Sequence, residues 1–242
     1  MIIKKIIKKL GYNYFKSKND RAIEEITPYE DKLINKCLKY SMTTRVRMWS
    51  LLNSINYIHN NNIQGDFVEC GVWKGGNLIL YELLNQKYNL DKKVFGFDTF
   101  EGMPMPGEHD YKYNNVSAID LYNRKVKIEN NWCKSTLDEV KGNILTECSN
   151  VNINLIKGKV ENTLLVKENI PDKISILRLD TDFYESTKIE LEILFPKLEK
   201  NGILIIDDYG TYKGARKAVD EYFKKKAFLI YIDHTCRLLI KN

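Results

Sequence analysis

Long apolar segments are missing from this sequence of 242 residues. No run approaches the roughly 20 consecutive apolar residues that a membrane-spanning helix requires. The first ten residues alternate isoleucine pairs with lysine pairs, so they lack the uninterrupted apolar stretch of a signal peptide. We therefore expect a cytoplasmic protein that does not span a membrane.

Cysteine and histidine spacings that bind metals are also missing. The five cysteines form no CxxC pair, and the three histidines lie far apart. A scattered, odd set of cysteines is typical of reduced thiols in a cytosolic protein. No P-loop and no GxSxG motif is present, so neither a nucleotide-phosphate cradle of that type nor a serine-hydrolase elbow is expected.

Excess positive charge is confined to the N-terminal end. The net charge is +6, from 38 Lys and Arg against 32 Asp and Glu, and residues 1–18 contain six lysines and no acid. The remainder is near neutral, whereas a nucleic-acid groove needs basic residues along an extended face. We expect no nucleic-acid partner.

The basic end has an amphipathic helical pattern. Over residues 1–10 the apolar side chains fall on one helical face and the lysines on the other. One interpretation is a helix that packs on the domain or on a second subunit, as amphipathic surface helices usually do. A second interpretation is a weak peripheral contact of residues 1–18 with an anionic membrane.

The rest of the chain predicts an α/β fold. Helices are expected near residues 29–40 and 44–60, and from Asp66 onward strands alternate with helices. The expected strands are Phe67–Cys70, Val94–Asp98, Asn152–Ile156, Ile174–Asp180 and Gly202–Asp207. The expected intervening helices cover residues 77–86, 136–148, 162–169, 185–196 and 212–225. Such alternation indicates a mostly parallel sheet covered on both faces.

The C-terminal end departs from this alternation. Phe228–Ile232 and Arg237–Ile240 are joined by only Asp233–Cys236, so these strands can pair only as an antiparallel hairpin. A doubly wound, Rossmann-like sheet that ends in such a hairpin is a feature of the class I S-adenosylmethionine methyltransferase fold. A dinucleotide-binding Rossmann domain instead adds another parallel strand.

We divide the chain into an N-terminal helical arm, residues 1–62, and a core, residues 63–242. An irregular insert rich in Pro, Gly, Tyr and Asn, residues 101–132, interrupts the core after the second strand. Long inserts without regular structure are usually functional or disordered. This one follows a strand at the sheet edge where ligands bind. We interpret it as a lid over the substrate; a mobile surface loop is the alternative.

A glycine-rich turn follows the first strand. Gly71, Gly75 and Gly76 lead into a helix, and Glu69 precedes them. Glycine allows a ligand to approach the backbone, and the helix N-terminus offers free N–H groups. A carboxylate here suits a ligand with an ammonium group and opposes a phosphate, which favours S-adenosylmethionine over NAD. At the end of the second strand, Asp98 is placed to bind the two hydroxyls of a ribose.

Acidic residues cluster at the ends of two later strands. Asp180 and Asp182 follow the fourth strand, and Asp207 and Asp208 follow the fifth. Adjacent parallel strands bring their carboxyl ends together, so Asp180, Asp207 and Asp208 should converge. Converging carboxylates need a cation, and an all-oxygen set suits Mg²⁺. A substrate hydroxyl bound there would lose its proton more readily, and Asp182 is the best-placed base. The alternative is that these acids only cap helices.

Six motifs of this chain resemble those of the macrocin O-methyltransferase (TylF/MycF-type) family. They are Ser41-Met42-Thr43-Thr44, GDFVECGVWKGG, FGFDTFEGMP, LRLDTDFYESTK, NGILIIDDYG and GARKAVDEYF. The resemblance covers residues 40–241. It implies a Mg²⁺- and S-adenosylmethionine-dependent O-methyltransferase acting on a sugar hydroxyl of a natural product or glycan. Family members are commonly oligomers, which implies a homo-oligomer here.

The resemblance also implies roles for individual residues. Asp180, Asp207 and Asp208 would bind the metal, with Asp180 and Asp182 as the catalytic pair and Asp182 as the base. The implied cofactor-binding residues are Met42, Thr43, Glu69, Gly71, Val72, Trp73, Asp98, Thr99, Phe100, Gly158 and Lys159. Among these, Met42 and Thr43 would close over the cofactor.

The acceptor is not named by these motifs, because they concern the cofactor and the metal. We expect a small-molecule hydroxyl acceptor: a free sugar, a sugar nucleotide or a glycan, with a phenolic diol as an alternative. A non-catalytic or membrane-associated partner in glycan assembly and an NAD-dependent dehydrogenase are rival hypotheses for the function. The acidic cluster opposes the former, and Glu69 and the terminal hairpin oppose the latter.

Overall fold

The computed structural model describes residues 23–127, 132–149 and 151–242. The expected amphipathic helix over residues 1–10, and any membrane contact through residues 1–18, lie outside these residues. Residues 1–32 and 33–242 form two separate units. In the first unit, Thr27 and Glu30 form reciprocal capping bonds, with Thr27 N donating to Glu30 Oε2 over 2.9 Å. Among the described residues, no helix is both long and apolar enough to cross a membrane.

Seven strands form one sheet in the order β3-β2-β1-β4-β5-β7-β6. The strands are β1 (Asp66–Cys70), β2 (Val94–Asp98), β3 (Ile153–Lys157), β4 (Ile174–Leu179), β5 (Leu198–Ile206), β6 (Ile230–Tyr231) and β7 (Arg237–Ile240). The first five pair in parallel, and β7 pairs antiparallel with both β5 and β6. The predicted doubly wound sheet with a terminal antiparallel hairpin is confirmed.

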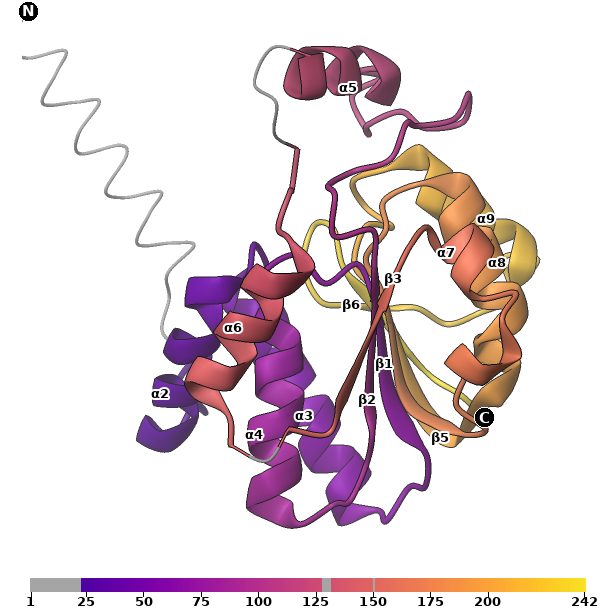
Figure 1. The fold of residues 1–242 in the computed structure, drawn as a ribbon. Helices are drawn as coiled ribbons and strands as arrows, with labels where there is room; N and C mark the ends of the chain where they lie inside the picture. The colour runs from indigo at the N-terminus through magenta and orange to yellow at the C-terminus, as the bar shows by residue number, and fades with distance from the viewer. Residues whose placement is uncertain (1–22, 128–131, 150) are drawn as a thin grey trace, which may run out of the picture. The chain divides into compact units, whose positions relative to one another are not determined.

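Helices cover both faces of this sheet (Figure 1). On one face lie α3 (Arg45–Asn60), α4 (Gly76–Tyr88) and α6 (Leu137–Glu147); on the other lie α7 (Val160–Thr163), α8 (Tyr184–Ile193) and α9 (Lys213–Tyr222). The remaining elements are α2 (Pro28–Cys37), η1 (Leu38–Tyr40), α5 (Ala118–Lys127), η2 (Lys167–Asn169) and η3 (Phe195–Lys197). Because both faces are covered, the central strands are apolar almost throughout, and every residue of β4 is buried.

Two sequence predictions about helices were wrong. The helix expected over residues 162–169 is split into α7 and η2, and the Asn169 side chain donates to the Thr163 carbonyl over 3.0 Å. That bond satisfies a carbonyl at the end of α7 and helps to stop it. The insert expected to be irregular contains α5, which starts beside Ser117, whose Oγ accepts from Asp120 N over 3.3 Å. The sequence did not predict this helix because the surrounding residues are rich in Pro and Gly, which are typical of irregular structure.

The strand order reverses next to β1, which lies between β2 and β4. In open α/β sheets, ligands bind at such a reversal, beyond the carboxyl ends of the strands. Gly71 follows β1 at this point with φ +88°, a left-handed conformation that favours glycine. A Cβ atom at Gly71 would lie 2.1 Å from the carbonyl oxygen of Asp180, which follows β4. The absence of a side chain therefore lets the two strand ends approach each other.

Two glycine-to-alanine variants test this constraint. We expect Gly71→Ala to lower the free energy of unfolding by more than about 2 kcal/mol, because the new methyl group would clash with Asp180 and strain the backbone. Gly142→Ala is the matched control, since Gly142 is exposed in α6 and a Cβ atom there meets nothing within 4 Å. It should raise stability by about 0.5–1 kcal/mol. Equal effects in urea denaturation would contradict the prediction.

Candidate active site

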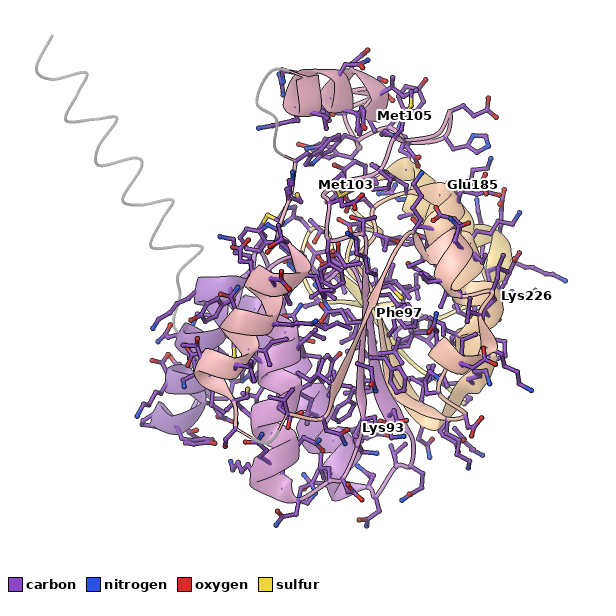
Figure 2. All side chains as sticks on the ribbon, viewed as in Figure 1. Lys93, Phe97, Met103, Met105, Glu185 and Lys226 are labelled. Carbon is purple, nitrogen blue, oxygen red and sulfur yellow. The ribbon has the colours of Figure 1, made fainter. Side chains whose placement is uncertain are left out.

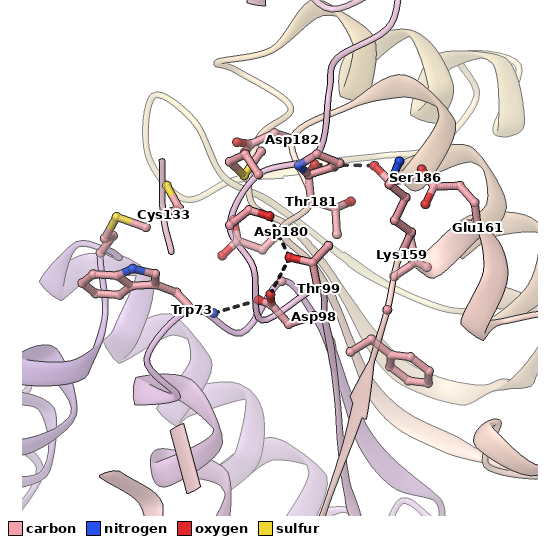
Figure 3. Close-up of a pocket in the computed structure, with 18 residues that line it drawn as sticks. Trp73, Asp98, Thr99, Cys133, Lys159, Glu161, Asp180, Thr181, Asp182 and Ser186 are labelled. Carbon is pink, nitrogen blue, oxygen red and sulfur yellow. Dashed lines mark hydrogen bonds between the residues drawn. The ribbon is translucent and has the colours of Figure 1, made fainter. Parts of the chain in front are cut away.

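The Asp98 carboxylate holds the turn after β1 against the turn after β2. Its Oδ2 atom accepts from Val72 N over 2.7 Å and from Trp73 N over 3.0 Å. Its Oδ1 atom accepts from Phe100 N over 2.8 Å. Figure 3 shows Asp98 at the centre of a pocket, with Trp73 on one side and Lys159 on the other. The carboxylate thus fixes both turns and still lines the pocket.

This pocket, the Asp98 cavity, lies at the reversal of strand order. It is lined by Met42, Gly71, Trp73, Phe97, Asp98, Thr99, Gly102, Met103, Pro104, Cys133, Gly158, Lys159, Val160, Glu161, Asp180, Thr181, Asp182 and Ser186. Figure 2 shows Phe97 and Met103, two of its apolar lining residues, within the fold. Seven of the eleven cofactor-binding residues predicted from the sequence are among its walls, which therefore suit a ligand with both apolar and polar parts.

The remaining four predicted cofactor-binding residues do not line the Asp98 cavity. Thr43 and Val72 line a neighbouring cavity instead. Phe100 is 2% exposed and belongs to the buried core. Glu69 is 1% exposed and lines neither cavity. Its contact with a cofactor ammonium group stays a prediction.

Glu69 instead supports a buried arginine. Its Oε1 atom accepts from Arg178 over 2.6 Å and from Asn77 Nδ2 over 2.7 Å. Desolvation raises the pKa of Glu69 to about 7, although the Arg178 charge and both hydrogen bonds oppose this shift. Glu69 is therefore placed to neutralise part of the positive charge of Arg178 beneath the site.

The acidic residues at the ends of β4 and β5 converge as the sequence predicts. Asp180, Asp207 and Asp208 can each offer a carboxylate oxygen so that the three atoms lie within 4.8 Å of one another. The parallel pairing sets this arrangement, since Asp207 N donates to the Leu179 carbonyl over 2.9 Å. We refer to Asp180, Asp207 and Asp208 as the acidic cluster.

Two arginines that the sequence analysis missed partly neutralise the acidic cluster. Arg178 is 3% exposed, and its guanidinium lies 2.7 Å from Asp180 Oδ2 and 2.9 Å from Asp207 Oδ1. The latter contact is an ion pair without hydrogen-bond geometry. Arg47, from α3, contacts Asp207 Oδ2 and lies 3.2 Å from Asp233 Oδ2. Arg178 could have been predicted to need buried carboxylate partners, because it lies within the apolar strand ISILRL. Nothing in the sequence indicated a role for Arg47.

Asp208 and Asp182 have no arginine or lysine ion-pair partner in the described part of the chain. Desolvation and the charge of Asp182 raise the pKa of Asp208 well above its ordinary value. Desolvation also raises the pKa of Asp182 to about 7, and the charges of Asp180 and Asp207 add to this shift. So much unpaired negative charge is unfavourable without a further cation.

The donor set fits a divalent cation. Asp207 Oδ1 and Asp208 Oδ2 are buried and accept no hydrogen bond from the described residues. Three carboxylates within reach of one point offer the hard oxygen ligands that Mg²⁺ prefers, with positions left for water or a substrate oxygen. The acidic cluster could hold such an ion.

A second cavity, the acidic cavity, lies against the cluster. It is lined by Ser41, Met42, Thr43, Arg47, Gly71, Val72, Trp73, Asn77, Lys112, Trp132, Cys133, Asp180, Asp182, Asp207, Asp208, Thr211, Tyr212 and Thr235. Six residues line both cavities: Met42, Gly71, Trp73, Cys133, Asp180 and Asp182. Two molecules bound in the two cavities would therefore meet beside Asp180 and Asp182.

Three residues of the wall that the two cavities share have a strained backbone. Trp73, Cys133 and Asp182 adopt left-handed conformations with φ of +48°, +53° and +68°. Such conformations are unfavourable for residues other than glycine and persist only when the surroundings enforce them. The geometry of this shared wall is therefore imposed by the fold.

The insert is tied to the loop that carries the acidic cluster. The Asp110 side chain is buried; its Oδ1 accepts from Tyr184 N over 2.9 Å and its Oδ2 from Gly107 N over 2.7 Å. Lys213 N donates to the Tyr111 carbonyl over 2.7 Å, and Tyr113 N donates to the Thr211 carbonyl over 2.8 Å. Residues 110–113, which we call the insert arm, are thus a fixed wall. Whether the whole insert acts as a lid stays a prediction.

The sequence and the fold of this chain both resemble those of known O-methyltransferases. A family model described as Macrocin-O-methyltransferase (TylF) matches residues 7–239. The chain is 28% identical to the O-methyltransferase NovP, whose solved structure superposes with a TM-score of 0.73 over 84% of this chain and 82% of that one. The fold seen here is therefore that of a methyltransferase.

Two curated relatives are similar over most of the chain. Demethyldecarbamoylnovobiocin O-methyltransferase of Streptomyces niveus is 30% identical over 181 residues, 74% of this chain and 66% of that protein. An 8-demethyl-8-(2,3-dimethoxy-alpha-L-rhamnosyl)-tetracenomycin-C 4'-O-methyltransferase of Streptomyces olivaceus is 28% identical over 190 residues, 76% of this chain and 67% of that protein. The chain thus matches about two thirds of the length of these relatives.

Arg178 should be a major source of stability. We expect Arg178→Met to lower the free energy of unfolding by about 3–5 kcal/mol, because Glu69 and Asp180 lose their buried counter-charge and Asp207 keeps only Arg47. Arg124→Met is the control, since Arg124 is exposed on α5 and should change stability by less than about 0.5 kcal/mol. Urea denaturation measures both, and a small loss for Arg178→Met would contradict the role assigned to the buried arginine.

Proposed function

The chain belongs to the Macrocin-O-methyltransferase (TylF) family of S-adenosylmethionine-dependent O-methyltransferases, and from this premise we propose that it methylates a sugar hydroxyl with the help of Mg²⁺. The sugar would belong to a natural-product glycoside, a glycan or a sugar nucleotide. One observation carries the proposal: the two cavities share Asp180 and Asp182, whereas Asp207 and Asp208 line only the acidic cavity. The Asp98 cavity would hold the methyl donor and the acidic cavity the acceptor.

The walls of each cavity support this division. Asp98 and Thr99 suit the hydroxyls of a ribose. Gly158, whose N donates to the Asp98 carbonyl over 2.9 Å, lies beside them with Lys159, where the adenine would pack. Trp132 and Tyr212 in the acidic cavity offer ring surfaces to the apolar face of a sugar. The rhamnosyl group in the name of the Streptomyces olivaceus relative also favours a sugar acceptor.

The acidic cluster would hold the metal ion through Asp180, Asp207 and Asp208. When bound, Mg²⁺ supplies Lewis-acid polarisation of the acceptor hydroxyl. Asp182, on the wall shared by both cavities, would accept the hydroxyl proton as the acceptor oxygen takes up the methyl group. When bound, S-adenosylmethionine would supply the methyl group, and S-adenosylhomocysteine, which keeps the electron pair of the broken sulfur–methyl bond, would be the leaving group. The fixed walls of the site contribute by orienting the two reactants.

Several expectations remain predictions. A phenolic diol could react by the same chemistry, because it also presents a hydroxyl to the acidic cluster. Homo-oligomer formation, a cytoplasmic location and closure of Met42 and Thr43 over the cofactor are likewise predictions. Family membership removes the hypotheses of a dehydrogenase and of a non-catalytic partner.

The metal assignment is tested most cleanly at Asp208, because Asp207 also neutralises two arginines. We expect Asp208→Asn to fold with equal or higher stability without metal, since it removes an unpaired buried carboxylate. Wild-type protein should gain about 2.7 kcal/mol of stability at Mg²⁺ concentrations 100-fold above Kd, and the variant should gain none. Thermal unfolding with and without Mg²⁺ measures this.

Asp172→Asn is the matched control for that experiment, since Asp172 is exposed and precedes β4, whereas Asp180 follows the other end of that strand. It should keep the wild-type response to Mg²⁺. A full Mg²⁺ response in Asp208→Asn would show that Asp208 is not a ligand.

The base assignment is tested at Asp182. We expect Asp182→Asn to bind S-adenosylhomocysteine and Mg²⁺ as the wild type does, while turnover falls by about 10²–10⁴-fold because the proton acceptor is lost. Calorimetry measures binding, and transfer of labelled methyl groups to a panel of glycosides, sugar nucleotides and phenolic diols measures turnover. Turnover within threefold of wild type would remove Asp182 from the mechanism. Failure of the wild type to bind S-adenosylhomocysteine would refute the proposed function itself.

A further inference from the structure

Lys112 contributes a positive charge to the acidic cavity that neither the sequence motifs nor the proposed chemistry has used. It lies on the insert arm and lines the cavity together with all four aspartates of the site. Its ammonium group lies 5.8 Å from the ring centroid of Tyr212, which is 5% exposed and lines the same cavity. The Lys112 side chain therefore lies near the Tyr212 ring in the cavity proposed for the acceptor.

The backbone holds Lys112 firmly in this position. Lys112 N donates to the Val116 carbonyl over 2.9 Å, and Lys112 forms an antiparallel bridge with Tyr212. On either side, Tyr111 and Tyr113 are bonded to the loop of residues 211–213. The buried Asp110 carboxylate anchors the start of the arm. Lys112 thus moves with the loop that carries Asp207 and Asp208.

The pairing of charges distinguishes Lys112 from the two arginines of the site. Arg47 and Arg178 each contact two or more carboxylates. No ion pair joins Lys112 to a carboxylate among the residues that the structure describes. Lys112 nevertheless lines the same cavity as Asp182, so both side chains can reach a molecule bound there. An ammonium group with three donors near the base, but without an ion-pair partner, can still bond to a ligand.

We propose that Lys112 orients the acceptor by donating a hydrogen bond to the oxygen next to the one that is methylated, so that the acceptor carries oxygens on two neighbouring carbons, as a vicinal diol does. This inference rests on the proposed function. An ammonium group is only a donor, so its partner must be an oxygen lone pair. With the reacting oxygen beside Asp182, a second oxygen on the neighbouring carbon would extend toward the arm. A charge-assisted bond of this kind selects both the class of acceptor and which hydroxyl reacts.

Two chromogenic probes test the proposal without knowledge of the natural acceptor. 4-Nitrocatechol carries two neighbouring oxygens, whereas 4-nitrophenol carries one. Each is titrated into full-length protein loaded with S-adenosylhomocysteine and Mg²⁺, so that no turnover occurs. We expect Lys112→Met to weaken 4-nitrocatechol binding by about 10-fold or more, as the loss of a hydrogen bond to a charged group implies. Binding of 4-nitrophenol should change by less than about twofold.

Lys213→Met is the matched control, because Lys213 sits beside the same arm but contacts Asn115 outside the acidic cavity. It should bind both probes as the wild type does, and Lys112→Arg should recover part of the lost affinity. Unchanged S-adenosylhomocysteine affinity in Lys112→Met confirms that this variant is folded.

Three outcomes would overturn the proposal. Unchanged 4-nitrocatechol binding in Lys112→Met would mean that both oxygens are held without the lysine. Equal weakening of both probes would show a general electrostatic effect. If the wild type binds S-adenosylhomocysteine and Mg²⁺ but neither probe, the vicinal-diol inference fails while methyl transfer stands; loss of those two ligands as well refutes the proposed function.

Discussion

A buried guanidinium organises the acidic end of this sheet. Arg178 comes from the interior of β4, where every residue is buried, and arginine cannot shed its proton to escape the cost of burial. It must therefore be surrounded by carboxylates, and Glu69, Asp180 and Asp207 provide them from three different strand ends. Because those ends must converge on one arginine, their side chains point to one place before any ligand arrives.

The same constraint divides the acids into two groups. Glu69 and Asp207 are engaged by arginines, and Glu69 lines neither cavity. Asp208 and Asp182 have no arginine partner in the described part of the chain, and desolvation together with the neighbouring carboxylates raises their pKa values. The arginine-paired carboxylates are stable as they are, whereas the carboxylates without an arginine partner gain stability when a cation binds beside them. The fold thus concentrates its unfavourable electrostatics where the proposed chemistry needs them.

Much of this arrangement could be predicted from the sequence. Alternating apolar strands and amphipathic helices located the sheet, and strand-end acids located the cluster, because parallel strands share a carboxyl edge. The direction of Glu69 could not be predicted, since it depends on which partner lies across β1 and β4, and register is a tertiary property. Arg47 was missed for the same reason: it lies 160 residues from Asp207 in sequence. The helix α5 was missed because Pro- and Gly-rich neighbours dominated the local pattern.

The attachment of the insert arm to the loop of residues 211–213 has an evolutionary consequence. The arm and the acidic loop form one rigid unit, so residues beyond the arm can change in length or sequence while Lys112 keeps its place beside the aspartates. Diversification of the outer insert would then alter which bulky molecule is admitted, while the reacting centre is left intact. One catalytic frame could in this way serve many differently decorated acceptors without being rebuilt for each.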